Sequence, residues 1–466
     1  MNPSIFKAYD IRGVYPQELD EKSAYAIGRA FVKFLRAKTI LVGQDSRPSS
    51  PALLKALTRG ITEAGADVVL AGALTTPMFY FAVANGKKYG GGIMVTASHN
   101  PAKYNGFKLV RGDARPVEPA ELLPIIKSKS PSSILPLSKG EEGGGRGKIT
   151  KIKIQDAYIK KLLSLADVKK IQPIKIVIDA GNGMAGAIVS KILTRLPQIK
   201  AEKLFFGVDM SFPNHEANPI NEATLATLKK TVIKNKAALG VAYDGDADRI
   251  GFVDEKGNAV RSDFIFSAIL PQILKHENMK TKKHENKKTI ILYDLRCSKI
   301  VPETIMSLGG KPQMTRVGHA FIKKQLRAAK AAAAAELSSH FYFKDFYGVE
   351  CSDLVMLYLL LEIGETKKPL SEIVKPFARY FQSGEINFEV KDKNAKISAL
   401  LKKYKKSATG FSDIDGIRME FKDSADWWWL NVRPSNTEPL LRLNMEANNK
   451  QLLSEKLKEL TEILKH

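Results

Sequence analysis

The chain of 466 residues contains only two cysteines, Cys297 and Cys351. Two cysteines exclude a disulfide framework and a four-cysteine metal site, and they favour a reducing compartment. The first thirteen residues also lack the basic, apolar and small-residue layout of a signal peptide. We therefore expect a cytoplasmic protein.

Long apolar segments are scarce as well. The one candidate for a membrane span, residues 68–86, contains no charged residue. Gly72 and the turn residues Thr75-Thr76-Pro77 divide it into a buried strand and a helix, which we expect to be capped by Thr76 with Pro77 at its first position. No membrane partner is expected.

Acidic residues are in the minority, with 49 against 73 lysines and arginines, so the formal net charge is +24. A field of this sign favours anionic partners such as phosphorylated metabolites, nucleic acid or an anionic membrane surface. A nucleic-acid-binding protein would show basic stripes interleaved with aromatic residues. The lysines are instead dispersed, apart from a run at residues 402–406, so no nucleic-acid partner is expected and a non-enzymatic anion binder is the weaker alternative.

Short β-branched runs alternate with amphipathic stretches over most of the chain, which indicates βαβ units and largely parallel sheets. Three successive units share this pattern, and from Ser371 onward the chain changes to a smaller α+β pattern. The fold class expected is therefore α/β, with three similar mixed-sheet domains and a smaller C-terminal α+β domain. The expected domains are residues 1–150 with a flexible linker at about 127–153, residues 151–258, residues 259–368 and residues 369–466. A lysine-rich insert at residues 276–288 is expected to be a solvated surface loop.

Polar and glycine-rich loops follow the predicted strands, where ligands collect in such folds. The most acidic of them is Asp244-Gly-Asp-Ala-Asp-Arg249. In an extended backbone the spacing of two places Asp244, Asp246 and Asp248 on one side, and three hard oxygen ligands suit Mg²⁺. A calcium loop would place Glu255 at its twelfth position, but its sixth position is Arg249 rather than glycine and its flanks are predicted strands. A solvated acidic turn is the remaining alternative.

Ser98 follows another predicted strand, in Thr96-Ala-Ser-His-Asn-Pro101. The glycines of a hydrolase nucleophile elbow are absent, since Thr96 and Asn100 stand in their places. Ser98 is therefore either an ordinary loop or helix-capping serine or a nucleophile for phosphoryl transfer.

A third motif, Arg433-Pro-Ser-Asn-Thr-Glu-Pro439, lies in a predicted turn between two alternating strands. A guanidinium binds phosphate oxygens bidentately, and small hydroxyl residues with exposed N–H groups complete a phosphate cradle. A plain polar hairpin turn is the alternative.

Five segments in this order resemble the α-D-phosphohexomutase superfamily, and specifically its phosphomannomutase/phosphoglucomutase group. They are residues 6–13 (Phe-Lys-Ala-Tyr-Asp-Ile-Arg-Gly), 96–101, 244–249, 336–340 (Glu-Leu-Ser-Ser-His) and 433–439. The resemblance spans nearly the whole chain and implies four domains around a central cleft. It also implies reversible interconversion of hexose 1-phosphates and 6-phosphates, with mannose or glucose phosphates as substrates.

The resemblance further implies a phosphorylated Ser98, with Mg²⁺ held by its phosphate oxygen and by Asp244, Asp246 and Asp248. A hexose 1,6-bisphosphate would be the intermediate and the activator, and the enzyme would be a monomer or weak dimer. The implied catalytic residues are Ser98, Lys108, Arg12, Arg249 and His99. The implied substrate-binding residues are Tyr9, Arg296, His319, Glu336, Ser338, His340, Arg433, Ser435, Asn436, Thr437 and Arg442.

Two departures from the family's patterns bear on the substrate and on activity. Phosphoglucosamine mutases, the nearest alternative, usually have Gln where Leu337 stands and Gly where Asn436 stands. Residues 328–335 read Ala-Ala-Lys-Ala-Ala-Ala-Ala-Ala, where the family has a mixed segment ending in Gly. Because alanine has the highest helix propensity, the run predicts a helix that continues from Phe321 to the sugar-binding loop and stiffens it. An inactive sugar-phosphate-binding homologue is therefore a further alternative.

Overall fold

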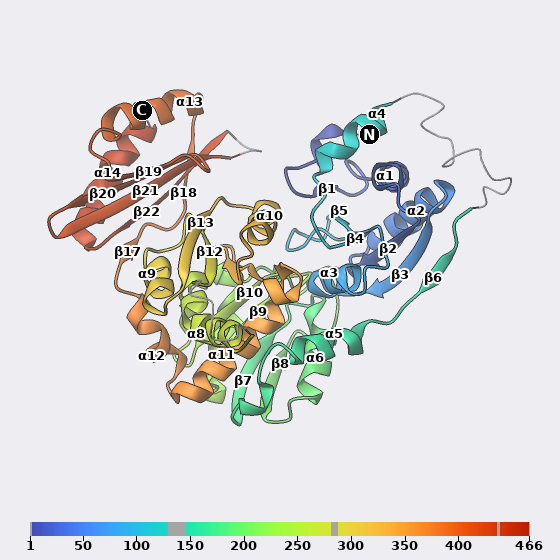
Figure 1. The fold of residues 1–466 in the computed structure, drawn as a ribbon, viewed down its shortest axis with the longest axis horizontal. Coiled ribbons are helices and arrows are strands. Elements are labelled where there is room, and N and C mark those ends of the chain that lie inside the picture. Colours follow the sequence, from blue (N-terminus) through green and yellow to red (C-terminus); the bar gives the residue numbers. More distant parts are fainter. Residues whose placement is uncertain (1, 129–145, 281–287, 436–438, 466) are drawn as a thin grey trace.

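The computed structural model describes residues 2–128, 146–280, 288–435 and 439–465, and four sheets organise them (Figure 1). We name the unit around each sheet domain I to IV, in chain order. The expected fold class, three mixed-sheet α/β domains followed by a smaller α+β domain, is confirmed.

Domain I has a six-stranded sheet of order β1-β5-β4-β2-β3-β6, in which β2, β3, β4 and β6 run parallel and β1 and β5 pair antiparallel. Its strands are β1 (Ile11–Val14), β2 (Thr39–Gln44), β3 (Asp67–Ala73), β4 (Gly91–Val95), β5 (Tyr104–Arg111) and β6 (Ile149–Lys151). Its helices are α1 (Glu21–Leu35), α2 (Ser50–Glu63), α3 (Thr76–Ala84) and α4 (Leu123–Lys127). Residues 149–151 lie in the expected flexible linker, yet they add the edge strand β6.

The uncharged segment at residues 68–86 divides into β3 and α3 as expected, with one correction. Thr75, not Thr76, caps α3, because its side chain accepts a hydrogen bond from the backbone N–H of Met78. Thr76 is the first helical residue and is fully buried. In the described part of the chain, no helix has the length and apolar character required to cross a membrane.

Domain II has a five-stranded sheet of order β11-β10-β9-β7-β8. Its elements are α5 (Gln155–Leu163), β7 (Ile174–Asp179), α6 (Ala185–Thr194), β8 (Ile199–Leu204), α7 (Ala226–Asn235), β9 (Leu239–Tyr243), β10 (Ile250–Asp254) and β11 (Ala259–Val260). The parallel strands β7, β8 and β9 are followed by the antiparallel strands β10 and β11.

Domain III has a sheet of order β13-β12-β14-β15-β16. Its strands are β12 (Ile290–Asp294), β13 (Lys311–Thr315), β14 (Ala333–Ala335), β15 (Phe341–Phe343) and β16 (Val349–Glu350). Its helices are α8 (Ser262–Lys280), α9 (Ile300–Ser307), α10 (His319–Ala329), α11 (Ser352–Thr366) and α12 (Leu370–Val374). The surface loop expected at residues 276–288 is wrong for its first part, since α8 continues to Lys280 and Nε2 of His276 lies 3.0 Å from Asp345 Oδ2.

The helix expected through the alanine run is also wrong. Helix α10 ends at Ala329, where Lys330 takes a left-handed conformation with φ 52°, and the alanines that follow form the central strand β14. Ala333 and Ala335 face the large core shared by domains I, II and III, while Ala334 faces a smaller cluster with Ile322 and Tyr342. Burial between β12 and β15 therefore overrides helix propensity.

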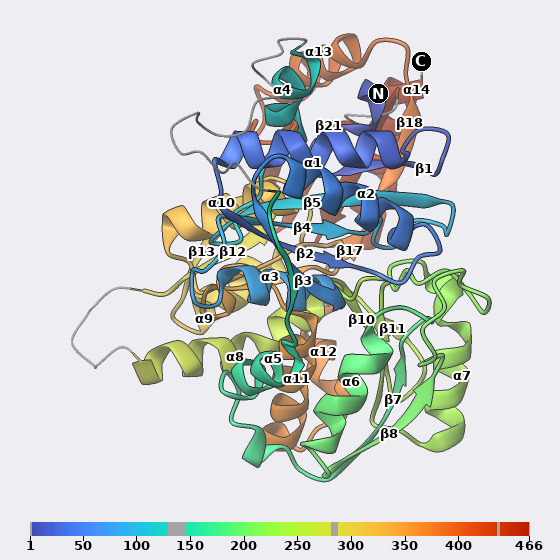
Figure 2. The ribbon, with the colours of Figure 1, turned by 90° about the vertical axis from the view of Figure 1, so that its right-hand side faces the viewer.

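Domain IV is an antiparallel sheet with its own apolar core. Figure 2 shows the molecule from the domain I side, with domain II below domain I in the view. The elements of domain IV are β17 (Phe381–Gln382), β18 (Ile386–Glu389), α13 (Lys393–Tyr404), β19 (Gly410–Ser412), β20 (Ile417–Asp423), β21 (Asp426–Pro434), β22 (Leu440–Ala447) and α14 (Lys450–Lys465). It meets domain III through polar contacts such as Arg418 to the Leu295 carbonyl and Asp415 to the Val317 N–H.

Candidate active site

Ser98 lies in the loop after β4, and its environment comes from two domains. Its Oγ donates a hydrogen bond of 3.0 Å to Oδ2 of Asp244 in domain II and lies 3.3 Å from Nδ1 of His99. The residue is buried and its backbone has φ +53°, a left-handed conformation that is rare for a residue other than glycine. The loop thus holds the serine hydroxyl towards domain II at the expense of local strain.

The close approach of the two loops requires glycine at position 245. A Cβ atom placed there would lie only 2.6 Å from the carbonyl oxygen of Ser98. A side chain at this position would separate the two domains at the point where Ser98 meets Asp244.

Asp244, Asp246 and Asp248 lie in the loop between β9 and β10, with carboxylate oxygens within 4.8 Å of one another. The three carboxylates cluster as we expected, but the backbone that carries them is not extended, so that part of the prediction is wrong. Residues 245–248 form a turn followed by a bend, and Ala247 has φ +61°. The calcium-loop alternative is excluded, because strands flank the loop and the Glu255 carboxylate accepts hydrogen bonds from Ser371 instead.

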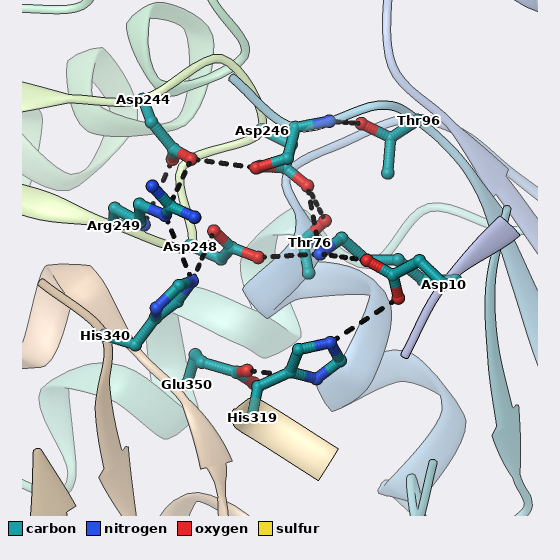
Figure 3. Close-up of polar contacts among 12 residues, drawn as sticks. Asp10, Thr76, Thr96, Asp244, Asp246, Asp248, Arg249, His319, His340 and Glu350 are labelled. Carbon is teal, nitrogen blue, oxygen red and sulfur yellow. Dashed lines mark hydrogen bonds and ion pairs between the residues drawn. The ribbon is translucent and has the colours of Figure 1, made fainter. Parts of the chain in front are cut away.

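Figure 3 shows Asp244, Asp246 and Asp248 close together, and this spacing of their carboxylate oxygens gives the triad the electrostatics of a cation site. Burial, followed by repulsion from Asp248 and Asp246, raises the pKa of Asp244 well above its usual range. Burial and Asp248 likewise raise the pKa of Asp246, whose Oδ1 makes no hydrogen bond with the described residues. Closely spaced, buried oxygen donors of this kind match a hard divalent cation, which would remove the repulsion between them.

Three cations border the triad. Nζ of Lys108 lies 3.0 Å from Asp248 Oδ2 and 3.6 Å from Asp10 Oδ2. Burial opposes its charge, but Asp10 and Asp248 raise the pKa of Lys108, so it is an ammonium ion at neutral pH. Arg12 donates to Asp10 and Asn100, and the Arg249 backbone N–H donates to Asp244.

Domain III contributes the segment after β14. Oε1 of Glu336 accepts a hydrogen bond of 2.9 Å from the Gly318 N–H, and Oε2 accepts one of 2.5 Å from the Tyr342 hydroxyl. Ser338 Oγ lies 3.0 Å from Nδ1 of His340, whose Nε2 is 3.3 Å from Asp248 Oδ1. These contacts join the Glu336 loop to the metal triad, and the strand β14 brings Glu336 directly to this edge of its sheet.

His319 lies at the start of α10 between two carboxylates. Its Nε2 is 3.6 Å from Asp10 Oδ1 and its Nδ1 is 4.0 Å from Glu350 Oε1. Burial lowers the pKa of His319 although Asp10 opposes the shift, so the ring is neutral at physiological pH. Tyr9 packs edge-on against the His319 ring at 5.4 Å and donates to the Val317 carbonyl.

A second group of expected site residues gathers in domain IV. Arg433 and Arg442 face each other across β21 and β22, and both contact Glu385. Arg296 of domain III reaches the same carboxylate. Ser435 donates its N–H to the Leu440 carbonyl, while Asn436 and Thr437 lie outside the described residues.

Several residues of these groups were not singled out from the sequence. Asp10 links Arg12, Lys108 and His319, and Thr76 donates a hydrogen bond of 2.6 Å to Asp246. Arg47 donates to the backbone carbonyls of the Ser98 loop. The rule that polar residues after a strand mark the site would have found Asp45 and Arg47, which follow β2, whereas no sequence signal pointed to Glu385.

Comparisons with known proteins show the family of this chain. Four family models match in order: "Phosphoglucomutase/phosphomannomutase, alpha/beta/alpha" domains I, II and III at residues 3–130, 156–257 and 267–380, and the C-terminal domain at residues 385–463. The phosphomannomutase of Methanocaldococcus jannaschii is 39% identical, with 99% of this chain and 97% of the relative covered. That of Escherichia coli is 37% identical, with 95% and 94% covered. The crystal structure of a phosphoglucomutase/phosphomannomutase family protein from Burkholderia thailandensis has a TM-score of 0.85 and 31% identity, and the two chains are covered to 100% and 98%.

The four-domain fold and these relatives define a phosphohexomutase, an isomerase that moves a phosphoryl group within a sugar phosphate. The chain belongs to the phosphoglucomutase/phosphomannomutase family.

Proposed function

We propose that the enzyme interconverts the 1-phosphates and 6-phosphates of mannose and glucose through a phosphoserine at Ser98. The observation that carries the proposal is the 3.0 Å contact between Ser98 Oγ and Asp244, beside a buried carboxylate triad. A serine in this position can carry a phosphate whose oxygen completes the ligand set of the aspartates. We place the enzyme in the cytoplasm, as a monomer or weak dimer.

The proposed reaction has two balanced halves. In the first, a sugar hydroxyl oxygen attacks the phosphorus of phosphoserine, the bond from phosphorus to Ser98 Oγ breaks, and the hydroxyl proton passes to Oγ. The product is a hexose 1,6-bisphosphate, which turns around in the site. In the second half, Ser98 Oγ attacks the other phosphate and returns its proton to the departing sugar oxygen. Added hexose 1,6-bisphosphate would phosphorylate Ser98 by this same second half, which makes it an activator.

The residues around Ser98 would neutralise the charge of the transferring group. Asp244, Asp246, Asp248 and the Ser98 phosphate would hold Mg²⁺, which when bound withdraws charge from the phosphoryl oxygens. Lys108 and Arg12 supply fixed positive charge on the domain I side, and Arg249 supplies it beside Asp244. His99, whose pKa is lowered by burial and by Arg249, would be a neutral partner that orients the Ser98 hydroxyl.

The remaining residues would bind the sugar and its distal phosphate. Glu336 and Ser338 would accept and donate hydrogen bonds to sugar hydroxyls, with Tyr9, His319 and His340 beside them. The distal phosphate would be anchored by Arg296, Arg433, Ser435, Asn436, Thr437 and Arg442. A fixed anchor of this kind works for both orientations of the substrate, since each presents one phosphate to Ser98 and one to the anchor.

The test is a coupled assay of the pure protein with Mg²⁺ and trace glucose 1,6-bisphosphate, offering mannose 1-phosphate, glucose 1-phosphate and glucosamine 1-phosphate in turn. We expect turnover of the mannose and glucose phosphates that EDTA abolishes and added Mg²⁺ restores. Preferred turnover of glucosamine 1-phosphate would support the phosphoglucosamine mutase alternative. If the protein binds all three sugar phosphates and turns over none of them, the result would support the inactive homologue.

A further inference from the structure

One carboxylate, that of Glu385, lies among three arginines from two domains. Its Oε2 is 3.1 Å from Arg433 and 3.5 Å from Arg296, and its Oε1 is 3.3 Å from Arg442. Glu385 belongs to the segment between β17 and β18, where the chain enters domain IV. All three arginines belong to the anchor proposed for the distal phosphate, so the anchor already contains an anion of its own.

The strand register explains why an anion is needed there. Arg433 and Arg442 are direct partners across the antiparallel pair β21 and β22. Like charges in that position repel each other. Glu385 forms ion pairs with both guanidinium groups and thereby relieves this repulsion. Partial burial alone would raise the pKa of the Glu385 carboxyl, but Arg296, Arg433 and Arg442 together hold that pKa below its ordinary value.

We propose that Glu385 occupies the place of the distal phosphate at these arginines and competes with it. The inference rests on the proposed role of Arg433 and Arg442 as a phosphate anchor. A phosphate dianion has more charge and more acceptor oxygens than a carboxylate, so it displaces Glu385 when substrate binds. The Glu385 side chain is 27% exposed, so solvent reaches it and it can leave the arginines without crossing the core.

Competition between Glu385 and the distal phosphate helps the bisphosphate intermediate to turn around in the site. Three guanidinium groups without a counter-charge would hold a phosphate too tightly for it to leave the anchor and return with the sugar reversed. Glu385 lowers the affinity of the anchor and supplies a replacement partner as the phosphate departs. The residue therefore balances substrate affinity against the rate of reorientation and release.

The experiment measures binding of glucose 1,6-bisphosphate to the Ser98→Ala variant by titration calorimetry, so that no turnover intervenes. Adding Glu385→Gln, which keeps the shape and removes the charge, should tighten binding about threefold to tenfold, as expected for a few partly exposed ion pairs. The control is Glu389→Gln, an exposed glutamate on the adjoining strand β18 for which the described residues contain no ion pair. The affinity of this control variant for glucose 1,6-bisphosphate should stay within about twofold of that of Ser98→Ala alone.

A double-mutant cycle locates the effect at the anchor. In an Arg433→Ala background, Glu385→Gln should give a smaller gain in affinity than it gives with Arg433 present, because one of the cations for which the two anions compete is missing. With Ser98 intact, Glu385→Gln should lower KM and lower kcat together.

Unchanged or weaker bisphosphate binding in Glu385→Gln would overturn the inference, and a raised KM would show that Glu385 orients the arginines instead. Failure of the proposed function would look different. The enzyme with Ser98 and Glu385 intact would then fail to turn over mannose and glucose phosphates, whatever the effect of Glu385→Gln on bisphosphate binding.

Discussion

The hydroxyl of Ser98 and the carboxylate of Asp244 belong to different domains and meet at 3.0 Å. The contact exists because Gly245 lets the domain II loop reach the backbone of Ser98 and because the Ser98 loop is held in a left-handed turn. The candidate nucleophile and the candidate metal ligands are thus brought together only when domains I and II dock.

Arg47 fixes the backbone of the Ser98 loop. Its buried guanidinium donates to four carbonyls of one loop, those of Ser98, Asn100, Pro101 and Tyr104, at 2.6 to 3.1 Å, and pairs with Asp45. Arg47→Met should leave these carbonyls unsatisfied, lower stability by about 3 kcal/mol and reduce kcat at least about tenfold.

Urea denaturation and steady-state kinetics check this prediction. Arg47→Lys should not restore activity, because one ammonium cannot reach four carbonyls in the geometry of a planar fork. Arg59→Met, at an exposed arginine on α2, is the control and should change neither quantity. Full activity in Arg47→Met would contradict the positioning role.

Thr76 supports the metal triad from the first turn of α3. Its hydroxyl donates a hydrogen bond of 2.6 Å to Asp246 Oδ2, which fixes one carboxylate of the proposed magnesium site. Thr76→Val keeps the shape and should raise the Mg²⁺ concentration for half-maximal activity about tenfold, the usual effect of losing such a supporting contact. Thr304→Val, which removes only a hydroxyl bond to the Ile300 carbonyl on α9, should leave that concentration unchanged. Equal Mg²⁺ requirements for both variants would refute the prediction.

Much of this architecture could be predicted from the sequence because local pattern and tertiary environment agree. Short apolar runs such as β9 form strands and amphipathic stretches such as α9 form helices, as the alternating pattern predicts. The loops after the strands hold Ser98 and the aspartates, as the general rule for α/β sheets predicts. The helix predicted for residues 328–335 is wrong because their pattern reports only helix propensity. The burial of β14 between β12 and the aromatic strand β15 depends on long-range pairing that the pattern does not contain.

The burial of the alanine strand β14 can be tested directly by substitution. Ala334 is fully buried in β14, so Ala334→Asp should place an unpaired charge in the core and cost more than about 3 kcal/mol. Ala328→Asp, at an exposed position of α10, should cost less than about 1 kcal/mol. Urea denaturation of the two variants distinguishes a buried strand from a surface helix, and similar small losses would contradict the strand.

The sequence could not reveal residues whose role depends on a partner far along the chain. Glu385 follows a glycine in a short polar segment and resembles any surface glutamate until Arg296 and Arg433 surround it. Asp10 was part of a quoted segment, yet its contact with Lys108 comes from the folding of domain I and its contact with His319 from the packing of domain I against domain III. Such residues are defined by three-dimensional juxtaposition.

The pair of His215 and Asp179 predicts a pH dependence of stability. Nε2 of His215 lies 3.0 Å from Asp179 Oδ2, and this hydrogen bond raises the pKa of His215 against the opposing effect of burial. The stabilisation is therefore complete below the unfolded pKa of about 6.5 and is lost as pH rises through the higher folded pKa. His215→Gln should lower stability more at pH 6 than at pH 9, with a difference of up to about 1 kcal/mol by urea denaturation. An equal loss at both values would contradict a protonated pair.

The most direct test of the central claim is the intact mass of the protein after incubation with glucose 1,6-bisphosphate and Mg²⁺, followed by peptide mapping, beside the coupled mutase assay. We expect one added phosphate on Ser98, and neither phosphate nor turnover in a folded Ser98→Ala variant. Turnover in Ser98→Ala, or a phosphate mapped to another residue, would contradict it.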